Sequence, residues 1–154
     1  RGSAGRGGGG GNLGFADLTG WSVDSSGTPR SFLSTEEHFQ TVKVLHEKNL
    51  IVPVSGDFGG PKALRAIGSY VREKGGTVTA FYVSNVEQYL FQDGKQKDFY
   101  ENVATLPITD GSVFIRPYSM RRYGGMALCG IGGFLKNAQA GRVPTYNDSM
   151  ACGQ

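Results

Sequence analysis

Two loops hold most of the side chains in this chain that could bind a ligand or take part in catalysis. Glycines allow a ligand to approach the backbone closely, and carboxylate, hydroxyl, amide and phenol groups can hydrogen-bond to it. The residues concerned are Gly56, Asp57, Phe58, Gly59 and Gly60 in the first loop, and Ser84, Asn85, Glu87 and Tyr89 in the second. We predict that they lie near a substrate or a cofactor, and we assign no catalytic role to any of them.

Each loop also has a structural interpretation that fits the residues equally well. Asp57 could cap the helix that begins at Pro61, and Ser84 followed by Glu87 has the spacing of a capping box. Neither loop has the GxxxxGKS/T or GxGxxG spacing of phosphate-binding loops. The ligand-binding and the capping interpretations therefore both stay open.

Other residues with reactive or metal-binding side chains give weaker signals. His38 and His46 lie eight residues apart on a predicted helix, which is not the four-residue spacing of paired metal ligands. Cys129 and Cys152 form no CxxC unit and have no histidine at ligand spacing, so we predict idle thiols rather than a zinc site or a disulfide. Arg116 ends a predicted strand, where it either faces the rim formed by the two loops or is solvated, and the solvated interpretation is favoured.

Composition limits the classes of protein to which the chain can belong. Its 154 residues, 38% of them hydrophobic, suffice for one domain with a sizeable core. A net charge of +3 without clustered Lys and Arg argues against nucleic acid as a partner. The chain contains no apolar run of about 18 residues, so the sequence predicts no membrane-spanning helix. Because the chain begins with Arg1, a signal peptide cannot be judged, and a cytoplasmic location is only the default.

The order of predicted elements indicates the fold class. Residues 1–14 are glycine-rich and cannot bury enough apolar surface to fold, so we predict a flexible linker or tail there. Ser34 with Glu37 has the spacing of a capping box at a helix start. Apolar periodicity then predicts a helix to about residue 49, a strand at 50–54, a helix at 61–74, a strand at 77–83, helices at 84–91 and 96–106, a strand at 112–116 and a helix at 126–140. This alternation predicts an α/β fold with a mostly parallel sheet flanked by helices, and the two loops should open on the same side of it.

Several longer segments resemble a known family. They are TPRSFLSTEEHFQ, NLIVPVSGDFGGPKALRAIGSYV, GGTVTAFYVSNVEQYLF and FYENVATLP, with AGRVPTYNDS near the end, so the resemblance runs from about Thr28 to Asp148. The family consists of uncharacterised bacterial proteins with a class I S-adenosylmethionine-dependent methyltransferase-like, or Rossmann-like, fold. The resemblance implies that residues 15–154 are the C-terminal half of such a domain, truncated on its N-terminal side. A preceding half would carry the first strands and the glycine-rich S-adenosylmethionine loop.

The same resemblance implies a cofactor and an orientation of the first loop. Asp57 and Phe58 would lie on the substrate side, although GDFG departs from the Asn/Asp-Pro-Pro-aromatic pattern of enzymes that methylate amino nitrogens. S-adenosylmethionine would be the cofactor of the complete protein. None is expected to bind tightly to this chain, which is expected to be inactive by itself.

Two functions follow as expectations. The first is that of the C-terminal part of an S-adenosylmethionine-dependent methyltransferase-like domain whose substrate is unknown. The alternative is a non-enzymatic binding or assembly module on the same scaffold. Because a truncated sheet exposes an edge and apolar surface, the expected partner is the missing N-terminal half or a second copy in a homodimer. A small-molecule substrate is compatible with both functions, and no membrane partner is expected.

Overall fold

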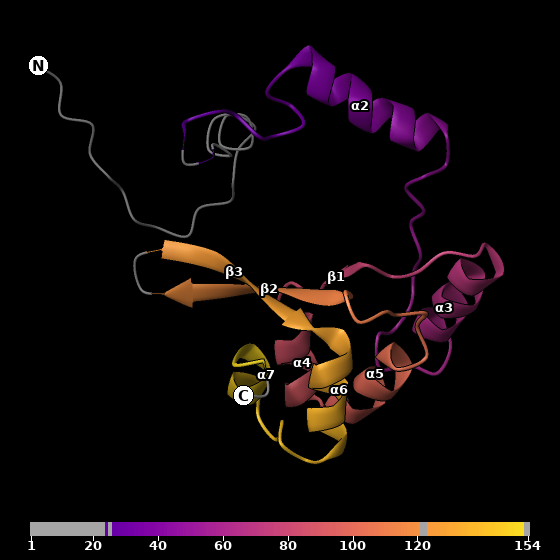
Figure 1. Cartoon of the computed structure of the whole chain (residues 1–154), viewed down its shortest axis with the longest axis vertical. Coiled ribbons are helices and arrows are strands. Elements are labelled where there is room, and N and C mark those ends of the chain that lie inside the picture. Colours follow the sequence, from indigo (N-terminus) through magenta and orange to yellow (C-terminus); the bar gives the residue numbers. More distant parts are fainter. Residues whose placement is uncertain (1–23, 25, 121–122, 153–154) are drawn as a thin grey trace, which may run out of the picture. The chain divides into compact units, whose positions relative to one another are not determined.

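The computed structural model describes Asp24 and residues 26–120 and 123–152 (Figure 1). The chain divides into two compact units, residues 1–53 and 54–154. We describe each unit by itself. The predicted tail, residues 1–14, lies outside the described residues.

The first unit contains one described helix, α2 (Glu36–Glu47), which begins one residue later than the sequence pattern predicts. Its N-cap is Thr35, whose hydroxyl accepts a hydrogen bond from the backbone amide of His38 at 3.1 Å. The hydroxyl of Ser34 instead donates to the carbonyl of Ser31. The predicted helix is confirmed, and the predicted capping pair of Ser34 with Glu37 is wrong. No residue of α2 is buried.

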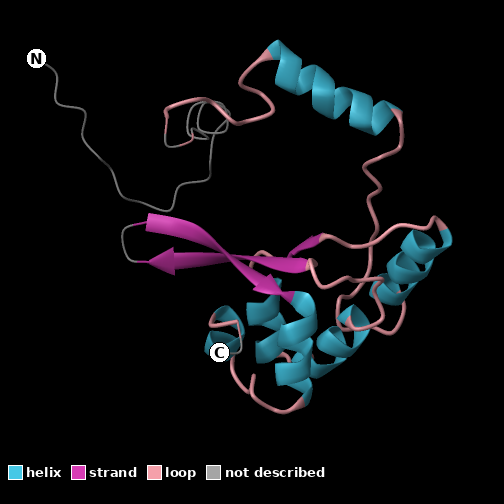
Figure 2. Ribbon diagram, in the orientation of Figure 1, coloured by secondary structure: helices cyan, strands magenta, loops and turns pink. Residues whose placement is uncertain are grey.

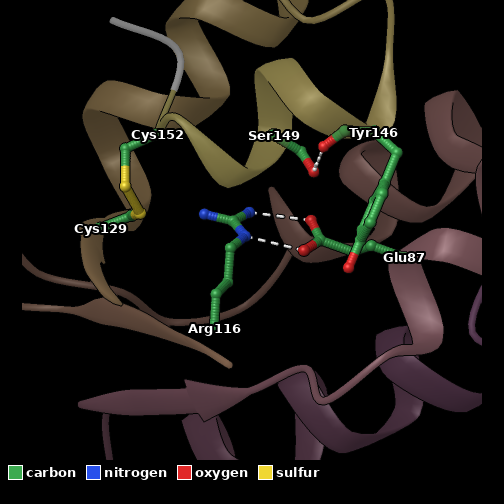
Figure 3. The surroundings of a disulfide bond; sticks show 6 residues. All are labelled: Glu87, Arg116, Cys129, Tyr146, Ser149 and Cys152. Carbon is green, nitrogen blue, oxygen red and sulfur yellow. Dashed lines mark hydrogen bonds and ion pairs between the residues drawn. A yellow bond between two sulfur atoms is a disulfide. The ribbon is translucent and has the colours of Figure 1, made fainter. Parts of the chain in front are cut away.

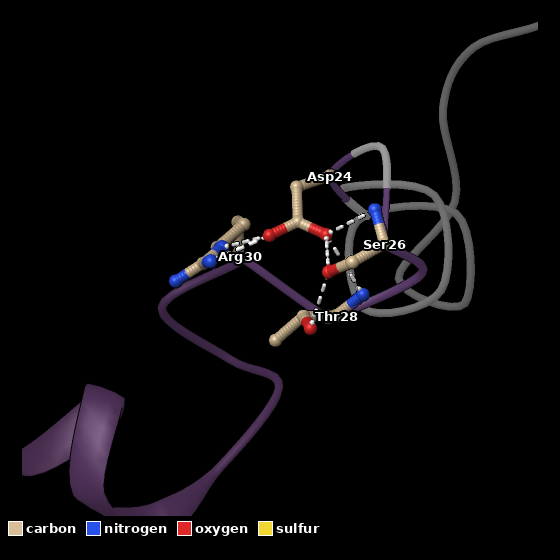
Figure 4. Close-up of polar contacts among 4 residues, drawn as sticks. All are labelled: Asp24, Ser26, Thr28 and Arg30. Carbon is tan, nitrogen blue, oxygen red and sulfur yellow. Dashed lines mark hydrogen bonds and ion pairs between the residues drawn. The ribbon is translucent and has the colours of Figure 1, made fainter.

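The loop before α2 is organised by the carboxylate of Asp24 (Figure 4). Its Oδ1 accepts hydrogen bonds from the backbone amides of Ser26 (2.9 Å) and Thr28 (3.0 Å), and its Oδ2 accepts one from Nε of Arg30 (2.8 Å). The hydrogen bond from the Ser26 hydroxyl, followed by that from Arg30, lowers the pKa of Asp24 to about 2. One ionised side chain therefore holds this loop together.

The second unit is built on a three-stranded mixed sheet in the order β1-β2-β3. Its strands are β1 (Ala80–Tyr82), β2 (Val113–Met120) and β3 (Tyr123–Gly130). The first two strands are parallel, with Phe81 opposite Phe114, whereas β2 and β3 are antiparallel, with Phe114 opposite Cys129. The predicted Rossmann-like, mostly parallel sheet is therefore wrong. The described residues form a small α/β fold with this mixed sheet and six helices.

Two predicted elements account for the difference. Residues 50–54 form no strand, and Leu50 and Val52 are 65% and 60% exposed. An apolar run becomes a buried parallel strand only where neighbouring strands and helices cover it, and Pro53 also removes a ladder donor. The predicted helix at 126–140 is divided, because its first part pairs with β2 as β3 and α6 begins only at Ile131. The glycines in this segment weakened the helix prediction, since glycine is a poor helix former.

Five helices complete the second unit, and four of them lie on one side of the sheet (Figure 2). Those four are α4 (Val86–Gln92), α5 (Gln96–Val103), α6 (Ile131–Gln139) and α7 (Tyr146–Met150). The fifth, α3 (Ala63–Glu73), contacts α5 and buries Leu64 and Gly68. Gly75 follows it at a φ of +69°, a conformation that glycine adopts readily after a helix.

The core lies between the sheet and these helices and is largely aromatic. Phe99, Phe114 and Phe134 are at most 2% exposed, and the rings of Phe114 and Phe134 meet edge to face with centroids 5.5 Å apart. Aromatic side chains bury large areas, and edge-to-face pairs add a little stability of their own. This core fixes the positions of α5 and α6 relative to β2.

The other face of the sheet is apolar and exposed within the described part of this unit. Tyr82, Ile115 and Leu128 lie side by side across the three strands, and Tyr82 and Leu128 are 53% and 67% exposed. Met126, two residues from Leu128 on the same strand, is 57% exposed. Apolar patches of this kind commonly mark contact surfaces.

Candidate functional site

A buried ion pair joins Glu87, which the sequence pattern placed in the second predicted loop, to Arg116, which it favoured as solvated. Nε and Nη2 of Arg116 donate to Oε2 and Oε1 of Glu87 at 2.7 and 2.8 Å (Figure 3). The two residues are 0% and 1% exposed. The hydroxyl of Tyr100 also donates to Oε1 of Glu87 at 2.8 Å. The favoured prediction of a solvated Arg116 is wrong, and we call this pair of Arg116 with Glu87 the buried ion pair.

Aromatic rings surround the buried ion pair. The guanidinium carbon of Arg116 lies 4.3 Å from the ring centroid of Phe114 and 4.2 Å from that of Phe134. Two rings this close to a guanidinium stabilise its charge through cation–π attraction. Burial, followed by the negative charge of Glu87, raises the pKa of Tyr100. Because Arg116 and Glu87 are shielded from water and solutes, the buried ion pair supports the fold and offers no access to a substrate.

The first predicted loop, residues 56–60, is a rigid turn. Oδ1 of Asp57 accepts the backbone amide of Gly59 and its Oδ2 accepts Nζ of Lys95, each at 2.9 Å. The N-cap of α3 is Lys62, so Asp57 does not cap that helix. The hydrogen bond from Lys95, then that from Gly59, lowers the pKa of Asp57. The carboxylate is therefore ionised and already engaged by a cation.

Side chains from α3 and α5 hold the rest of this turn. Nδ2 of Asn102 donates to the carbonyls of Phe58 (3.1 Å) and Gly60 (2.8 Å), while its Oδ1 accepts Nε of Arg65 at 2.7 Å. A Cβ at Gly56 would lie 2.4 Å from the Cβ of Ala63. Gly56 is thus required by the close approach of the turn to α3, not by the approach of a ligand.

The second predicted loop separates into buried and exposed residues. Asn85, not Ser84, is the N-cap of α4, and it makes no side-chain cap hydrogen bond. Ser84 has a φ of +46°. The predicted capping box is wrong because Glu87 turns into the core, whereas Tyr89 is 55% exposed.

The structure does not show the two predicted loops acting as one site. Within the described residues, no hydrogen bond, ion pair or ring contact joins residues 56–60 to Ser84, Asn85, Glu87 or Tyr89. The first loop is instead linked to α5 and to Lys95, the residue immediately before α5. The prediction that these nine residues contact one substrate or cofactor stays a prediction.

A cavity lies between α5 and α6, two helices that the sequence pattern did not single out as a site. Its volume is about 380 Å³, within the size range of small-molecule sites. We call it the α5/α6 pocket. The residues that line it are Gln96, Lys97, Tyr100 and Glu101 from α5, Leu135, Ala138 and Gln139 from α6, and Val143. In the sequence, the α5 residues are spaced by one helical turn, which indicates that they share one face of a helix. That spacing does not reveal which helix packs against this face.

The α5/α6 pocket combines an apolar wall with a polar rim. Leu135 and Val143 are only 6% and 7% exposed. Lys97 and Glu101 face each other on the rim, with Nζ and Oε1 3.8 Å apart. Oε1 of Gln96 is buried and has no hydrogen-bond partner among the described residues. An unpaired buried amide oxygen costs stability, so it gains from any N–H donor that reaches it.

The two cysteines form a disulfide, which corrects the prediction of idle thiols. The Cα atoms of Cys129 and Cys152 are 5.5 Å apart, a normal separation for a disulfide (Figure 3). They are 23 residues apart in the sequence, and only the packing of β3 near the end of α7 brings them together. Disulfides persist mainly in oxidising environments.

Within the described residues, neither a cluster of metal ligands nor a membrane-spanning helix is present. They contain no group of three or more His, Cys, Asp or Glu side chains that could hold a metal ion. His38 is engaged by the Ser34 hydroxyl, with Nδ1 and Oγ 3.1 Å apart. None of the helices in this part of the chain has both the length and the apolar character to cross a membrane.

Comparison with known proteins adds one match. The model of a protein family described as a domain of unknown function, DUF7790, matches residues 21–139. This range includes α5 and α6 and therefore most of the lining of the α5/α6 pocket. No curated protein matches the chain.

Proposed function

The chain belongs to the DUF7790 family, and on that premise we propose that its second unit binds a small molecule in the α5/α6 pocket. This function corresponds to the alternative expected from the sequence, a binding module without catalysis. It does not depend on a Rossmann-like sheet.

The observation that carries the proposal is the lining of the pocket. The cavity of about 380 Å³ has an apolar wall, and a ligand that replaces water against that wall lowers the free energy of the system. The unpartnered Oε1 of Gln96 adds a polar group that selects for a donor. Few convergent polar groups on a mainly apolar wall are typical of small-molecule sites.

These features define a class of ligand. Its body is a compact aromatic or aliphatic group that packs on Leu135 and Val143. Its head is an N–H donor, such as an amide, which reaches Gln96 after rotation of the terminal amide of that side chain. Opposite charges on Lys97 and Glu101 favour an uncharged or zwitterionic ligand over a strongly charged one.

Benzamide and methyl benzoate provide a matched test of this class. The two molecules have nearly the same shape, but only benzamide carries N–H donors. In a titration followed by the NMR methyl signals of Leu135, Ala138 and Val143, we expect benzamide to bind with a dissociation constant of about 1 mM, and methyl benzoate several-fold more weakly. Equal binding of both would contradict the role of Gln96, and no shift with either would contradict the pocket.

Two alanines allow the site to be filled selectively. Ala138 lines the pocket, whereas Ala140 follows α6 as its C-cap and is exposed. We expect Ala138→Phe to abolish benzamide binding and Ala140→Phe to leave it unchanged. Loss of binding in both variants, with the fold intact by circular dichroism, would point to a site elsewhere.

The S-adenosylmethionine-dependent function expected from the resemblance stays a prediction. The loops that it requires at one site, residues 56–60 and Ser84 to Tyr89, are engaged separately in structural contacts. Calorimetry with S-adenosylmethionine and its demethylated product tests it directly. Heat of binding that persists in Ala138→Phe would assign the cofactor to a site other than the α5/α6 pocket.

A further inference from the structure

The disulfide closes a segment that carries half of the α5/α6 pocket. Cys129 lies on β3 immediately before α6, and Cys152 follows α7. The segment between them contains Leu135, Ala138, Gln139 and Val143, which are all the pocket residues that do not come from α5. The core positions α6, so the attachment of the segment's end bears on the part of this half that follows α6, which includes Val143.

Apart from the disulfide, noncovalent contacts hold α7 in place. The helix has five residues, too few for stability in isolation. Thr145 and Asp148 form a capping box at its start. The ring of Tyr146 meets that of Phe91 edge to face, with centroids 6.3 Å apart. The capping box is local and the ring contact is a single pair between α7 and α4, so the covalent link at Cys152 is the strongest attachment of α7.

The end of the segment adjoins both the pocket and the buried ion pair. Ser149 of α7 is fully buried, and its hydroxyl donates to the carbonyl of Tyr146 at 2.7 Å. The ring of Phe91, which contacts Tyr146, also meets the ring of the pocket residue Tyr100 edge to face, with centroids 6.4 Å apart. Figure 3 shows the guanidinium of Arg116 between Glu87 on one side and the disulfide on the other. Nη1 of Arg116, on the side away from Glu87, is buried and has no partner among the described residues. Displacement of α7 would expose this charge and loosen the Tyr100 wall.

We propose that the Cys129–Cys152 disulfide is a redox-sensitive clamp that keeps α7 closed and the α5/α6 pocket formed. This inference rests on the proposed binding function, whose regulation it describes. A dithiol reductant supplies the two electrons and two protons of the opening step. The bond between the two Sγ atoms breaks, each sulfur gains a hydrogen, and the dithiol becomes a cyclic disulfide. Cys152 is partly exposed whereas Cys129 is buried, so we expect the reductant to approach from the side of Cys152.

Dithiothreitol and amide hydrogen exchange test the clamp in the full chain. We expect reduction to raise the exchange rate of residues 146–150 about tenfold, while the strands stay protected. We also expect the dissociation constant of benzamide to rise about fivefold, which corresponds to a closed fraction of about one fifth after reduction. Reoxidation should restore both values.

Cys152→Ser separates the clamp from other effects of the reductant. This variant should behave as the reduced chain does, with or without dithiothreitol, and Cys152→Ala should match it. Circular dichroism serves as the control, and both variants are expected to give the spectrum of a folded chain. Unchanged exchange at residues 146–150 and unchanged benzamide affinity after reduction would overturn the clamp. Failure of benzamide to bind the oxidised chain would overturn the proposed binding function, and with it this regulation, whatever the exchange shows.

Discussion

Removal of one member of the buried ion pair is the most severe single perturbation that the structure predicts. In Arg116→Met, the carboxylate of Glu87 stays at 1% exposure and keeps only the hydrogen bond from Tyr100. An uncompensated buried charge of this kind costs about 3–5 kcal/mol. Since small domains have only about 5–15 kcal/mol of stability, the variant should be close to unfolding.

The double variant Glu87→Leu with Arg116→Met should be far less affected. It removes both charges together and retains most of the volume between Phe114 and Phe134. Replacement of a buried ion pair by apolar residues is often neutral or stabilising by about 1–4 kcal/mol. The two single changes should therefore be strongly non-additive, with a coupling energy of about 3 kcal/mol or more.

Guanidinium chloride denaturation followed by far-ultraviolet circular dichroism measures these free energies of unfolding. Lys97→Met is the matched control, because Lys97 forms an ion pair with Glu101 while its side chain is 84% exposed. Its loss should cost about 0.5 kcal/mol or less. If Arg116→Met lost no more stability than Lys97→Met, the guanidinium would not be buried against Glu87, and the description of the core would be wrong.

Three further changes test separate features of the second unit. Because the pKa of Tyr100 is raised, the folded chain keeps the phenol proton at pH values at which the unfolded chain loses it. The contribution of this group to the free energy of unfolding should therefore be fully present below about pH 10. Above that pH, the free energy of unfolding should fall by about 1.4 kcal/mol per pH unit. Denaturation midpoints across this range check the slope, which should flatten in Tyr100→Phe. Reduction of the disulfide between Cys129 and Cys152 should lower the free energy of unfolding by about 3 kcal/mol, given its 23-residue separation, and denaturation with and without dithiothreitol measures it. Gly56→Ala should cost about 1–3 kcal/mol, because the new methyl group would lie 2.4 Å from the Cβ of Ala63, and a thermal melt unchanged from the parent chain would contradict that contact.

Elements that depend on local contacts were predictable from the sequence. The helices α2, α3 and α5 and the strand β1 lie within the ranges that periodicity indicated, α4 ends one residue later, and β2 extends four residues beyond its predicted end. The stop of α3 at Gly75 follows from the tolerance of glycine for positive φ. Each of these features is decided within a few residues of chain.

The candidate site was less predictable because its chemistry depends on burial. Glu87 and Asp57 both follow apolar segments in polar loops, yet Glu87 is buried against Arg116 while the side chain of Asp57 is 50% exposed beside Lys95. The sequence contains no local difference that assigns one carboxylate to the core. The α5/α6 pocket went unpredicted for a related reason, since its two walls are more than 30 residues apart in the sequence.

Amino-acid order alone thus determined where most helices and two of the strands form, because helix periodicity, turn residues and β-branched runs act through neighbouring backbone groups. Tertiary structure alone decided that residues 50–54 stay unpaired, that the segment before Ile131 becomes β3, and that Cys129 meets Cys152. The physical reason is the same in each case. Whether a strand pairs, a charge is buried or two thiols meet depends on which distant surface packs beside it.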